Sequence, residues 1–350
     1  MNGTIADYGE QEILKRLQGF CLPDLIGDDG AVLGLESLLA TAGSELVVTT
    51  DVLVDRVHFS ESTTPAAAVG WRAVAANLSD LAAMGADPLG ITVGLALPPT
   101  CPWAWVLELY QGMERCFARQ GCIPGQGLFR GIVGGDLCRS AVPTIAITAF
   151  GLAFPQYILQ RKGLQVGDQL VVTGDHGPSR AGLALLQNEI PRTPGLAAAA
   201  WIQAHQYPNP RLEVLPLLRA LQDTLHPQRC LGGMDSSDGL ADAVLQLCRA
   251  SGVGARLHRH HLPLPPGLTD WVGEAKAVQW CLYGGEDFEL VLGLPPHQVE
   301  PFLNQVAGAR WIGEVIEEPT VTLWDSQQPE RSESLGLEWG FQHFRHSHVA

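Results

Sequence analysis

The chain has 350 residues, of which 46% are hydrophobic, so it can bury a large core, and its length favours two domains over one. Its net charge of −15 argues against a nucleic acid as the main partner, because contacts to a phosphate backbone need clustered Lys and Arg. The lysines are Lys15, Lys162 and Lys276 alone. A polyphosphate ligand would therefore need its charge offset by divalent metal held on carboxylates.

Cysteine usage and hydropathy indicate the compartment. The eight cysteines are scattered without a C-x-x-C pair, which is typical of reduced thiols in a cytosolic protein. The N-terminus is acidic, and no apolar run approaches the roughly 18 residues that a membrane span requires. The sequence therefore predicts a cytoplasmic protein without a membrane partner.

Short apolar runs rich in β-branched residues alternate with helical patterns, which is typical of a mixed α/β (α+β) architecture. In chain order the pattern predicts helix 11–17, strand 46–50, helix 65–84, strand 91–97, helix 102–119, strand 144–152, strand 169–173, helix 179–187, helix 211–221, helix 239–250, strand 288–294, helix 297–306 and strand 321–324. The polar stretch at residues 154–163 lies between two strands and predicts the domain boundary.

Acidic residues recur in Gly-rich turns and at strand ends, where a rigid scaffold can present them. Asp28 and Asp29 lie in a tight turn, for which a plain surface turn is the simpler interpretation. Thr49, Thr50 and Asp51 follow an apolar run. Hydroxyls beside a carboxylate suit a hard cation, and a strand-end turn explains them equally well.

Asp80 is the most informative single acid. It lies in the predicted helix 65–84, where its neighbours at three and four residues, which include Ala76 and Ala83, make a small, largely apolar face. An ionised Asp there is costly to bury unless it is paired or coordinates metal. A structural Asp with its own partners is the alternative, and the pattern favours a ligand.

Two further acidic motifs admit two interpretations each. Gly134 and Gly135 would let a phosphate approach the backbone beside Asp136, although a glycine pair alone is weak evidence. Asp235 and Asp238 open the predicted helix 239–250 together with two serines. Acids there could hold metal or simply cap the helix.

The standard nucleotide loops are absent from the sequence. Neither G-x-x-x-x-G-K-[ST] nor a G-x-G-x-x-G opening a βαβ unit occurs. The turn at residues 173–179 follows a strand and precedes a helix, so it could present N–H groups to a phosphate, and a plain strand-to-helix connection explains it equally well. The segment 284–289, with a glycine pair and three acids, is by itself a turn into a strand.

Taken in this order, these segments resemble the thiamine-monophosphate kinase family, within the larger group that includes aminoimidazole-ribotide synthetase, selenophosphate synthetase and hydrogenase-maturation proteins. The resemblance runs through most of the chain and is carried by Ile26-Gly27-Asp28-Asp29, Val48-Thr49-Thr50-Asp51 with Val57-His58-Phe59, Asn77-Leu78-Ser79-Asp80-Leu81-Ala82-Ala83-Met84-Gly85-Ala86, Gly134-Gly135-Asp136, Ser237-Asp238-Gly239-Leu240 and Gly284-Gly285-Glu286-Asp287-Phe288-Glu289.

The resemblance implies transfer of the ATP γ-phosphoryl group to thiamine monophosphate, giving thiamine diphosphate and ADP. It implies a two-domain aminoimidazole-ribotide synthetase-like fold and a homodimer in which the N-terminal mixed sheets pair. Residues 1–154 would form the ATP/Mg-binding and dimerisation domain, and residues 155–350 a C-terminal α/β sandwich that completes the active site. Because the acceptor phosphate is already anionic, no catalytic base is expected, and several Mg²⁺ ions would neutralise the two polyanions.

Matching motif positions implies three sets of site residues. The magnesium ligands are Asp29, Thr49, Thr50, Asp51, Asp80, Asp136, Asp235 and Asp238. The ATP contacts are Gly135, Asp136, Arg161 and Ser237. The thiamine-phosphate pocket contains His58, Glu286 and Phe341.

The sequence departs from the family pattern at several positions near these motifs. Ser236 stands where an aliphatic residue is usual, and Asp175 and His176 where small or apolar residues are usual. Phe341 replaces a tyrosine. The predicted metal ligands are intact.

The alternatives are a sister enzyme of the same fold, a non-catalytic nucleotide-binding protein, and a metal-binding protein that uses His343, His346 and His348. A selenophosphate synthetase would place a Lys beside a reactive Cys, which Cys21 lacks, and a hydrogenase-maturation protein would end in Cys, whereas this chain ends in Ala350. A non-catalytic relative would lack metal acids, and every matched acid is present. A solvated tail is the simpler interpretation of the histidines.

Overall fold

The computed structural model describes residues 4–8, 10–21, 43–190, 195, 197–225 and 229–340. The chain forms two compact units. Unit 1 consists of Met1–Ile158 and Gln206–Cys230, and unit 2 of Leu159–His205 and Leu231–Ala350. Among the described residues, no helix is long and apolar enough to cross a membrane.

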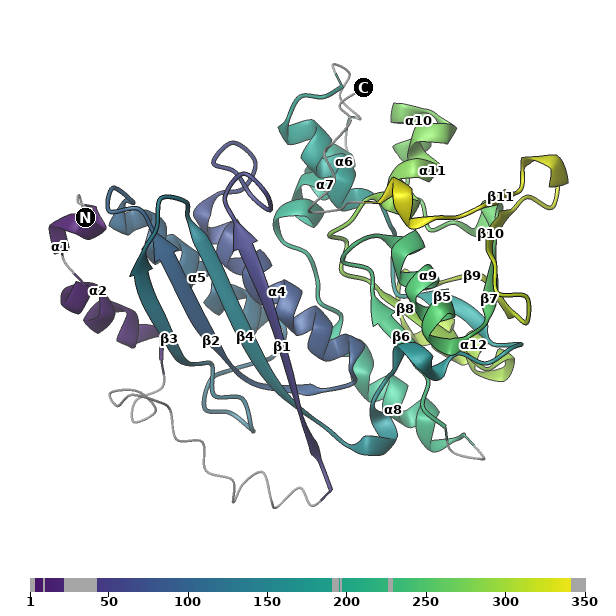
Figure 1. Cartoon of the computed structure of the whole chain (residues 1–350), viewed down its shortest axis with the longest axis horizontal. Helices are drawn as coiled ribbons and strands as arrows, with labels where there is room; N and C mark the ends of the chain where they lie inside the picture. Colours follow the sequence, from purple (N-terminus) through teal and green to yellow (C-terminus); the bar gives the residue numbers. More distant parts are fainter. Residues whose placement is uncertain are drawn as a thin grey trace. The chain divides into compact units, whose positions relative to one another are not determined.

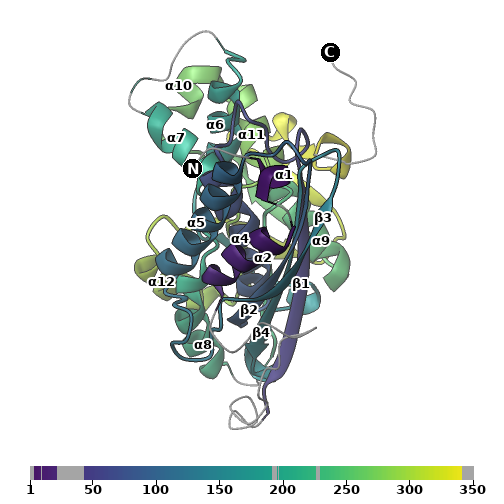
Figure 2. The same cartoon turned by 90° about the vertical axis from the view of Figure 1, so that its left-hand side faces the viewer.

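Unit 1 is a four-stranded sheet with two long helices on one face (Figures 1 and 2). The strand order is β1-β4-β2-β3, with antiparallel pairs except for the parallel pair β2 and β3. Its elements are α1 (Ile5–Tyr8), α2 (Glu10–Leu17), η1 (Gln18–Phe20), β1 (Glu45–Val54), α4 (Ala66–Ala83), β2 (Asp87–Leu97), α5 (Trp103–Arg119), β3 (Ile132–Arg139), β4 (Thr144–Ala153), η2 (Pro155–Tyr157), η4 (Leu212–Val214) and α8 (Leu215–Asp223).

Two glycines set the spacing between α4 and α5. A Cβ added at Gly70 would lie 1.8 Å from the carbonyl oxygen of Leu109, and one added at Gly112 would lie 1.9 Å from that of Ala67. Side chains larger than hydrogen are therefore excluded at both positions, because backbone stands opposite each of them. The contact sets the position of α4, which carries Asp80, against α5.

Unit 2 is built on a seven-stranded mixed sheet of order β11-β10-β7-β9-β5-β8-β6, in which only β10 and β7 are parallel. Its elements are η3 (Arg161–Gly163), β5 (Gln169–Val172), α6 (Pro178–Leu186), α7 (Ala197–Gln206), β6 (Gly232–Asp235), α9 (Leu240–Ser251), β7 (Gly254–His258), η5 (Arg259–His261), α10 (Leu268–Val272), α11 (Glu274–Tyr283), β8 (Leu290–Leu294), α12 (Pro296–Gln305), β9 (Arg310–Ile316), β10 (Val321–Trp324), η6 (Pro329–Arg331), β11 (Glu333–Ser334) and η7 (Leu337–Trp339).

The core of unit 2 has two parts that share α11. Apolar side chains of α9 and α11, among them Leu247 and Cys281, pack on one face of the sheet against residues such as Val291. A second cluster joins α6, α7, α10 and α11 through Trp201, Trp271 and other residues. Helix α12 contacts β5 and β9 and buries its Phe302 outside both clusters.

The six predicted strands are confirmed as β1, β2, β4, β5, β8 and β10, and the seven predicted helices as α2, α4, α5, α6, α8, α9 and α12, with shifted ends. Strand β8 begins only at Leu290, because Glu286 and Phe288 have φ of 68° and 53°, outside the extended region. The pattern missed β3, β6, β7, β9, β11, α1, α7, α10 and α11. Glycines at the centre of β3 and the start of β6 resemble a turn, although both segments are paired strands.

The chain leaves unit 1 after Ile158, but residues 206–230 return to it, so the prediction of one domain over 155–350 differs from the structure there. The reason is packing: η4 contacts α4, and α8 contacts η2 and η4. Amphipathic spacing in 211–221 shows that this helix has an apolar face. It does not show which core covers that face.

We expect Gly112→Ala to lower the free energy of unfolding by about 1–3 kcal/mol, because α4 and α5 must separate to admit the methyl group. Helix propensity alone would act in the opposite direction by about 1 kcal/mol. Gly19→Ala is the control, since a Cβ there meets no atom within 4 Å. Urea unfolding followed by circular dichroism measures both, and equal stability of Gly112→Ala and the parent would contradict the close contact.

Candidate active site

The inner face of β1 in unit 1 carries two predicted metal ligands. Side chains alternate along the strand, so Thr49 and Asp51 share the face that also buries Leu53, while Val48 and Val52 point to the exposed face. Helix α4 brings Asp80 to the inner face, where the Thr49 hydroxyl donates a hydrogen bond to Oδ2 of Asp80. Two of the predicted ligands, from distant parts of the sequence, are therefore in direct contact.

This face has the chemistry that a hard cation prefers. Thr49, Asp51 and Asp80 are partly buried and offer hydroxyl and carboxylate oxygens, the ligands that Mg²⁺ takes in proteins. The residues thus fit the predicted metal. The hydroxyl contact also supplies Asp80 with the partner that a structural Asp requires, so the metal role stays a prediction.

Thr50 and Asp136 lie on the opposite face of the same sheet. The register pairs Asp51 with Ile147, Ile147 with Val93, and Val93 with Gly135, so these positions share the inner face. Thr50 and Asp136 are each one position away and point outward. Thr50 Oγ1 donates to the carbonyl oxygen of Ile147 at 2.8 Å, and Asp136 is exposed on the edge strand β3. Their ligand roles stay predictions.

Gly135 has a structural reason to be glycine. A Cβ there would lie 2.2 Å from the carbonyl oxygen of Val93 on the neighbouring strand β2. Close packing of β3 on β2 therefore requires glycine, whatever binds nearby. Contact between Gly135 and a nucleotide stays a prediction.

His58 is held in a tight turn after β1. Its Nδ1 accepts a hydrogen bond from the backbone N–H of Val54 at 3.1 Å, and its carbonyl oxygen accepts one from Nη2 of Arg72 at 3.0 Å. Because Nδ1 accepts, the proton of a neutral imidazole lies on Nε2. The ring is partly buried and its orientation is fixed from both sides of the residue.

Three loops of unit 2 meet at one edge of its sheet, where β5, β8 and β6 are neighbours. Residues 173–179 follow β5, residues 236–239 follow β6, and residues 284–289 precede β8. Because β8 is antiparallel to both neighbours, the ends of β5 and β6 lie beside its beginning. We call these segments the loop cluster.

Buried polar contacts hold the loop cluster together. The Thr173 hydroxyl donates to Oε2 of Glu289 at 2.5 Å and accepts from the N–H of Leu290 at 2.9 Å. The N–H of Ser236 donates to the carbonyl oxygen of Glu289 at 2.9 Å, and that of Glu286 to the carbonyl oxygen of Ser237 at 2.7 Å. Each loop is therefore tied to the segment 284–289.

Asp287 occupies the N-terminus of α6. Its carboxylate accepts from the N–H groups of Gly177 at 2.7 Å and Ser179 at 2.8 Å. Burial raises the pKa of Asp287 well above its usual range, although these two bonds act in the opposite direction. Two N–H groups of the 173–179 turn are thus already used, which favours a plain strand-to-helix connection over a phosphate site.

The predicted metal and ATP residues of unit 2 gather at the N-terminus of α9. Asp235 is buried and its Oδ1 accepts from the Ser237 hydroxyl at 3.3 Å, while Asp238 is exposed. Burial, together with the charge of Asp238, raises the pKa of Asp242, and the charge of Arg161 lowers it. Asp242 therefore lies within electrostatic reach of both Asp238 and Arg161. Sequence analysis missed Asp242, whose only signal is an acid in the first turn of a helix.

Glu286 adopts a left-handed backbone, with φ of 68°, between two glycines and a buried acid. Nδ1 of His205 lies 3.9 Å from Oε2 of Glu286 and 3.2 Å from the hydroxyl oxygen of Ser179. A non-glycine residue with positive φ costs energy and is often found at functional sites. His205 was also missed, because a lone histidine at the end of a helix gives no signal in the sequence.

The other predicted site residues lie outside the described part of the chain. Asp29 and Phe341 belong to the residues that the structure does not describe. Within the described ranges, no group of three or more His, Cys, Asp or Glu side chains is placed to hold a metal ion. Thr49, Asp51 and Asp80 belong to unit 1, whereas Asp235 and Asp238 belong to unit 2.

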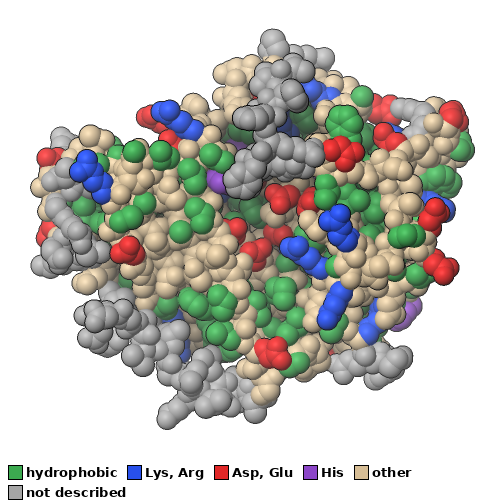
Figure 3. Space-filling view, in the orientation of Figure 1, with side chains coloured by type: hydrophobic (Ala, Val, Ile, Leu, Met, Phe, Trp, Pro, Cys, Tyr) green, Lys and Arg blue, Asp and Glu red, His purple; other side chains and the backbone are tan. Residues whose placement is uncertain are grey.

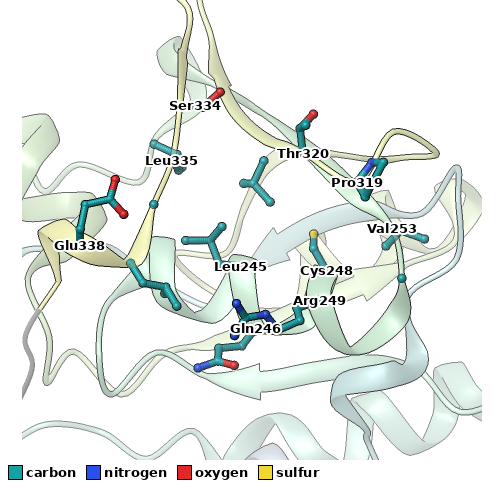
Figure 4. A pocket seen from close by; sticks show the side chains of 14 residues that line it. Leu245, Gln246, Cys248, Arg249, Val253, Pro319, Thr320, Ser334, Leu335 and Glu338 are labelled. Carbon is teal, nitrogen blue, oxygen red and sulfur yellow. The ribbon is translucent and has the colours of Figure 1, made fainter.

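Unit 2 also contains an open cavity of about 630 Å³, shown in Figure 4. Leu245 and Cys248 of α9 and Leu335 line its apolar wall, and Arg249 and Glu338 are polar lining residues. None of the predicted site residues that the structure describes lines this cavity.

Similarity to known proteins defines the fold class of the chain. The family model for the N-terminal domain of AIR synthase related proteins matches residues 27–153, and that for their C-terminal domain matches residues 165–326. The fold is thus the two-domain fold of the AIR synthase related proteins. A thiamine-monophosphate kinase of Synechococcus elongatus is 47% identical over 342 residues, covering 97% of this chain and 98% of that protein. The chain belongs to the thiamine-monophosphate kinase family.

Further relatives support the same family and the same fold. A thiamine-monophosphate kinase of Prochlorococcus marinus is 38% identical over 97% of this chain and 96% of its own length. AaThiL, solved in complex with AMPPCP and TMP, matches with a TM-score of 0.69 and 28% identity, over 94% of this chain and 96% of that chain. HypE of E. coli has a TM-score of 0.71 at 22% identity over 94% of this chain and 97% of that chain, a likeness that shows the fold alone.

We expect Thr173→Val to lower the free energy of unfolding by about 1–3 kcal/mol, because it removes a donor to the buried Glu289 carboxylate and the acceptor of the Leu290 N–H. Thr173→Ser keeps the hydroxyl and is the control. Thermal unfolding of the two variants separates the hydroxyl from the methyl group. Equal losses in both would show that packing, not the hydrogen bonds, matters here.

Proposed function

We propose that this chain is a magnesium-dependent kinase that transfers the γ-phosphoryl group of ATP to thiamine monophosphate, giving thiamine diphosphate and ADP in thiamine diphosphate biosynthesis. The observation that carries the proposal is 47% identity to a thiamine-monophosphate kinase over almost the whole of both chains. AaThiL, which shares the fold and binds AMPPCP and TMP, supports the same pair of substrates.

The composition of the chain matches this chemistry. The acceptor is a phosphate oxygen that is already anionic, so the enzyme needs to position and neutralise two polyanions and does not need a general base. Mg²⁺, when bound, would supply the positive charge that neutralises the phosphate groups. Thr49, Asp51 and Asp80 would hold it in unit 1, because they place oxygen ligands on one partly buried face.

In unit 2 we assign the ATP contacts to Arg161 and Ser237 and the metal contacts to Asp235 and Asp238. Arg161 is a permanent cation close to the first turn of α9, where its charge acts on Asp242. The hydrogen bond from Ser237 to Asp235 fixes the orientation of that carboxylate. Contacts to thiamine monophosphate are assigned to His58, Glu286 and Phe341, of which the first two have fixed backbones.

We also propose a homodimer that forms through the outer face of the unit 1 sheet. Leu46, Val48 and Val52 of β1 are 59%, 54% and 46% exposed, although all three are large and apolar. Figure 3 shows hydrophobic side chains across this face, the one turned toward the viewer. Apolar surface of this kind is typical of a protein interface. A cytoplasmic location is proposed as well, since all eight cysteines are free.

Asp51→Asn tests the enzyme. We expect it to lower the rate of ADP release with ATP, Mg²⁺ and thiamine monophosphate by about two orders of magnitude, because a metal ligand loses its charge. Glu45→Gln, at the exposed start of the same strand, should match the parent. Thiamine diphosphate formed by the parent supports the proposal. ADP release with another co-substrate only would assign the chain to a sister activity, and full activity of Asp51→Asn would contradict the metal assignment.

Leu46→Asp combined with Val48→Asp tests the dimer. We expect light scattering to give the mass of one chain for this variant and of two chains for the parent, since two buried charges would oppose the sheet contact. Val166→Asp is the matched control, because Val166 is 57% exposed but belongs to unit 2. A parent that is monomeric, or a variant that still associates, would contradict the proposed interface.

A further inference from the structure

His176 and Ser236 form a buried polar pair inside the loop cluster. The His176 ring has no exposed surface and Ser236 is 1% exposed, and Nε2 of the ring lies 2.9 Å from the serine hydroxyl oxygen. His176 follows β5 and Ser236 follows β6, and β8 separates these two strands in the sheet. The pair therefore joins two loops across the strand that lies between them.

Each partner is fixed on its other side. Nδ1 of His176 lies 3.2 Å from the carbonyl oxygen of Gly174, and Nε2 lies 2.9 Å from the Ser236 hydroxyl oxygen, so both ring nitrogens are within hydrogen-bond distance of a partner. The backbone N–H of His176 donates to the carbonyl oxygen of Pro263 at 2.8 Å. The Ser236 hydroxyl donates a hydrogen bond to the carbonyl oxygen of Glu289 at 3.1 Å. The ring orientation and the serine rotamer are thus determined together.

Ser236 stands between two residues that were assigned to metal and ATP. Asp235 precedes it and Ser237 follows it, and the Ser237 hydroxyl donates to the Asp235 carboxylate. The carbonyl oxygen of Ser236 accepts the N–H of Gly239 at 3.0 Å, which closes the turn that displays Asp238. Because the Ser236 side chain points into the core, its anchoring sets where the neighbouring side chains emerge.

His176 and Ser236 form a buried hydrogen-bonded pair. Removing one member of a buried hydrogen-bonded pair leaves the other unsatisfied, whereas replacing both by apolar groups can leave stability nearly unchanged. The effect of this pair on stability can therefore be measured separately from its effect on the position of residues 235–238.

We propose that His176 is a positioning residue that holds residues 235–238 in their nucleotide-binding geometry through its hydrogen bond with Ser236. The inference rests on the proposed function for the identity of the ligand. The hydrogen bond itself, its burial and its place beside Asp235 and Ser237 come from the structure.

The test compares His176→Leu, Ser236→Ala and the double variant with the parent. Calorimetry measures the Kd for Mg·AMPPCP, steady-state kinetics give KM for ATP and kcat, hydrogen exchange reports the amides of residues 235–239, and calorimetric scanning gives Tm. We expect His176→Leu to weaken Mg·AMPPCP binding and raise KM for ATP by about tenfold, with a smaller change in kcat and faster exchange at 235–239. In the double variant Tm should recover, while the weak binding and the fast exchange should persist.

Two control variants accompany this test. His176→Gln can still form a hydrogen bond with the serine hydroxyl and should restore part of the binding, and His297→Leu, on the exposed first turn of α12, should match the parent throughout. Parental binding and exchange in His176→Leu, or binding that recovers in step with Tm in the double variant, would overturn the positioning role and leave a structural one.

The same data separate this inference from the proposed function. A parent that binds Mg·AMPPCP but forms no thiamine diphosphate contradicts the proposed substrate, and the comparison of variants by binding and exchange still decides the role of His176. A parent that does not bind Mg·AMPPCP contradicts both.

Discussion

The architecture of unit 2 depends on satisfying two acids that are almost fully buried at the start of β8. Asp287 and Glu289 are 8% and 7% exposed, and a buried carboxylate is tolerated only when donors surround it. Asp287 takes its donors from the N-terminus of α6 and Glu289 from Thr173 at the end of β5. These requirements tie the loop after β5 to residues 287–289, and backbone hydrogen bonds join the same segment to the loop after β6, where Asp235 and Ser237 are displayed. Left-handed backbone at Glu286 follows, because the chain must turn sharply to direct successive acids to different partners.

In unit 1, close packing of two helices positions the predicted metal ligands. Glycine at positions 70 and 112 lets α4 and α5 approach until backbone meets backbone, which sets the position of α4 against α5. Asp80 then faces β1 rather than solvent, and the hydroxyl of Thr49 meets it. The site on this unit thus depends on helix packing, since β1 presents Thr49 and Asp51 and α4 supplies Asp80.

The sequence predicted those features that depend on local pattern. Long periodic segments such as α4 and α5 and β-branched strands such as β1 were found, and so were the acids of each motif, because period and turn chemistry are local properties. The face on which a ligand lies was not predictable. Thr50 points away from Asp51 because neighbouring residues of β1 face opposite sides of the sheet, whereas the predicted strand ended at Thr50. The side that Asp136 faces depends on the register of β3 and on a bulge in the β2–β3 pairing, which are properties of the assembled sheet. The roles of His205 and Asp242 were not predictable either, because these residues become part of a site only through packing. For residues 206–230, the sequence did not show which of the two cores the helix would cover.

A lysine-poor chain that binds polyphosphate needs another source of positive charge to offset the phosphates. The structure argues against one of the possible sources. A helix N-terminus is a common answer, but the carboxyl group of Asp287 already occupies two N–H donors at the N-terminus of α6. The N-terminus of α9 carries Asp238 and Asp242, where burial and the charge of Asp238 raise the pKa of Asp242 and the charge of Arg161 lowers it. Acids concentrated where anions would otherwise bind are costly unless cations join them. That cost is the physical reason to expect divalent metal in this protein, and it explains why acidic residues outnumber basic ones at the loops assigned to ATP.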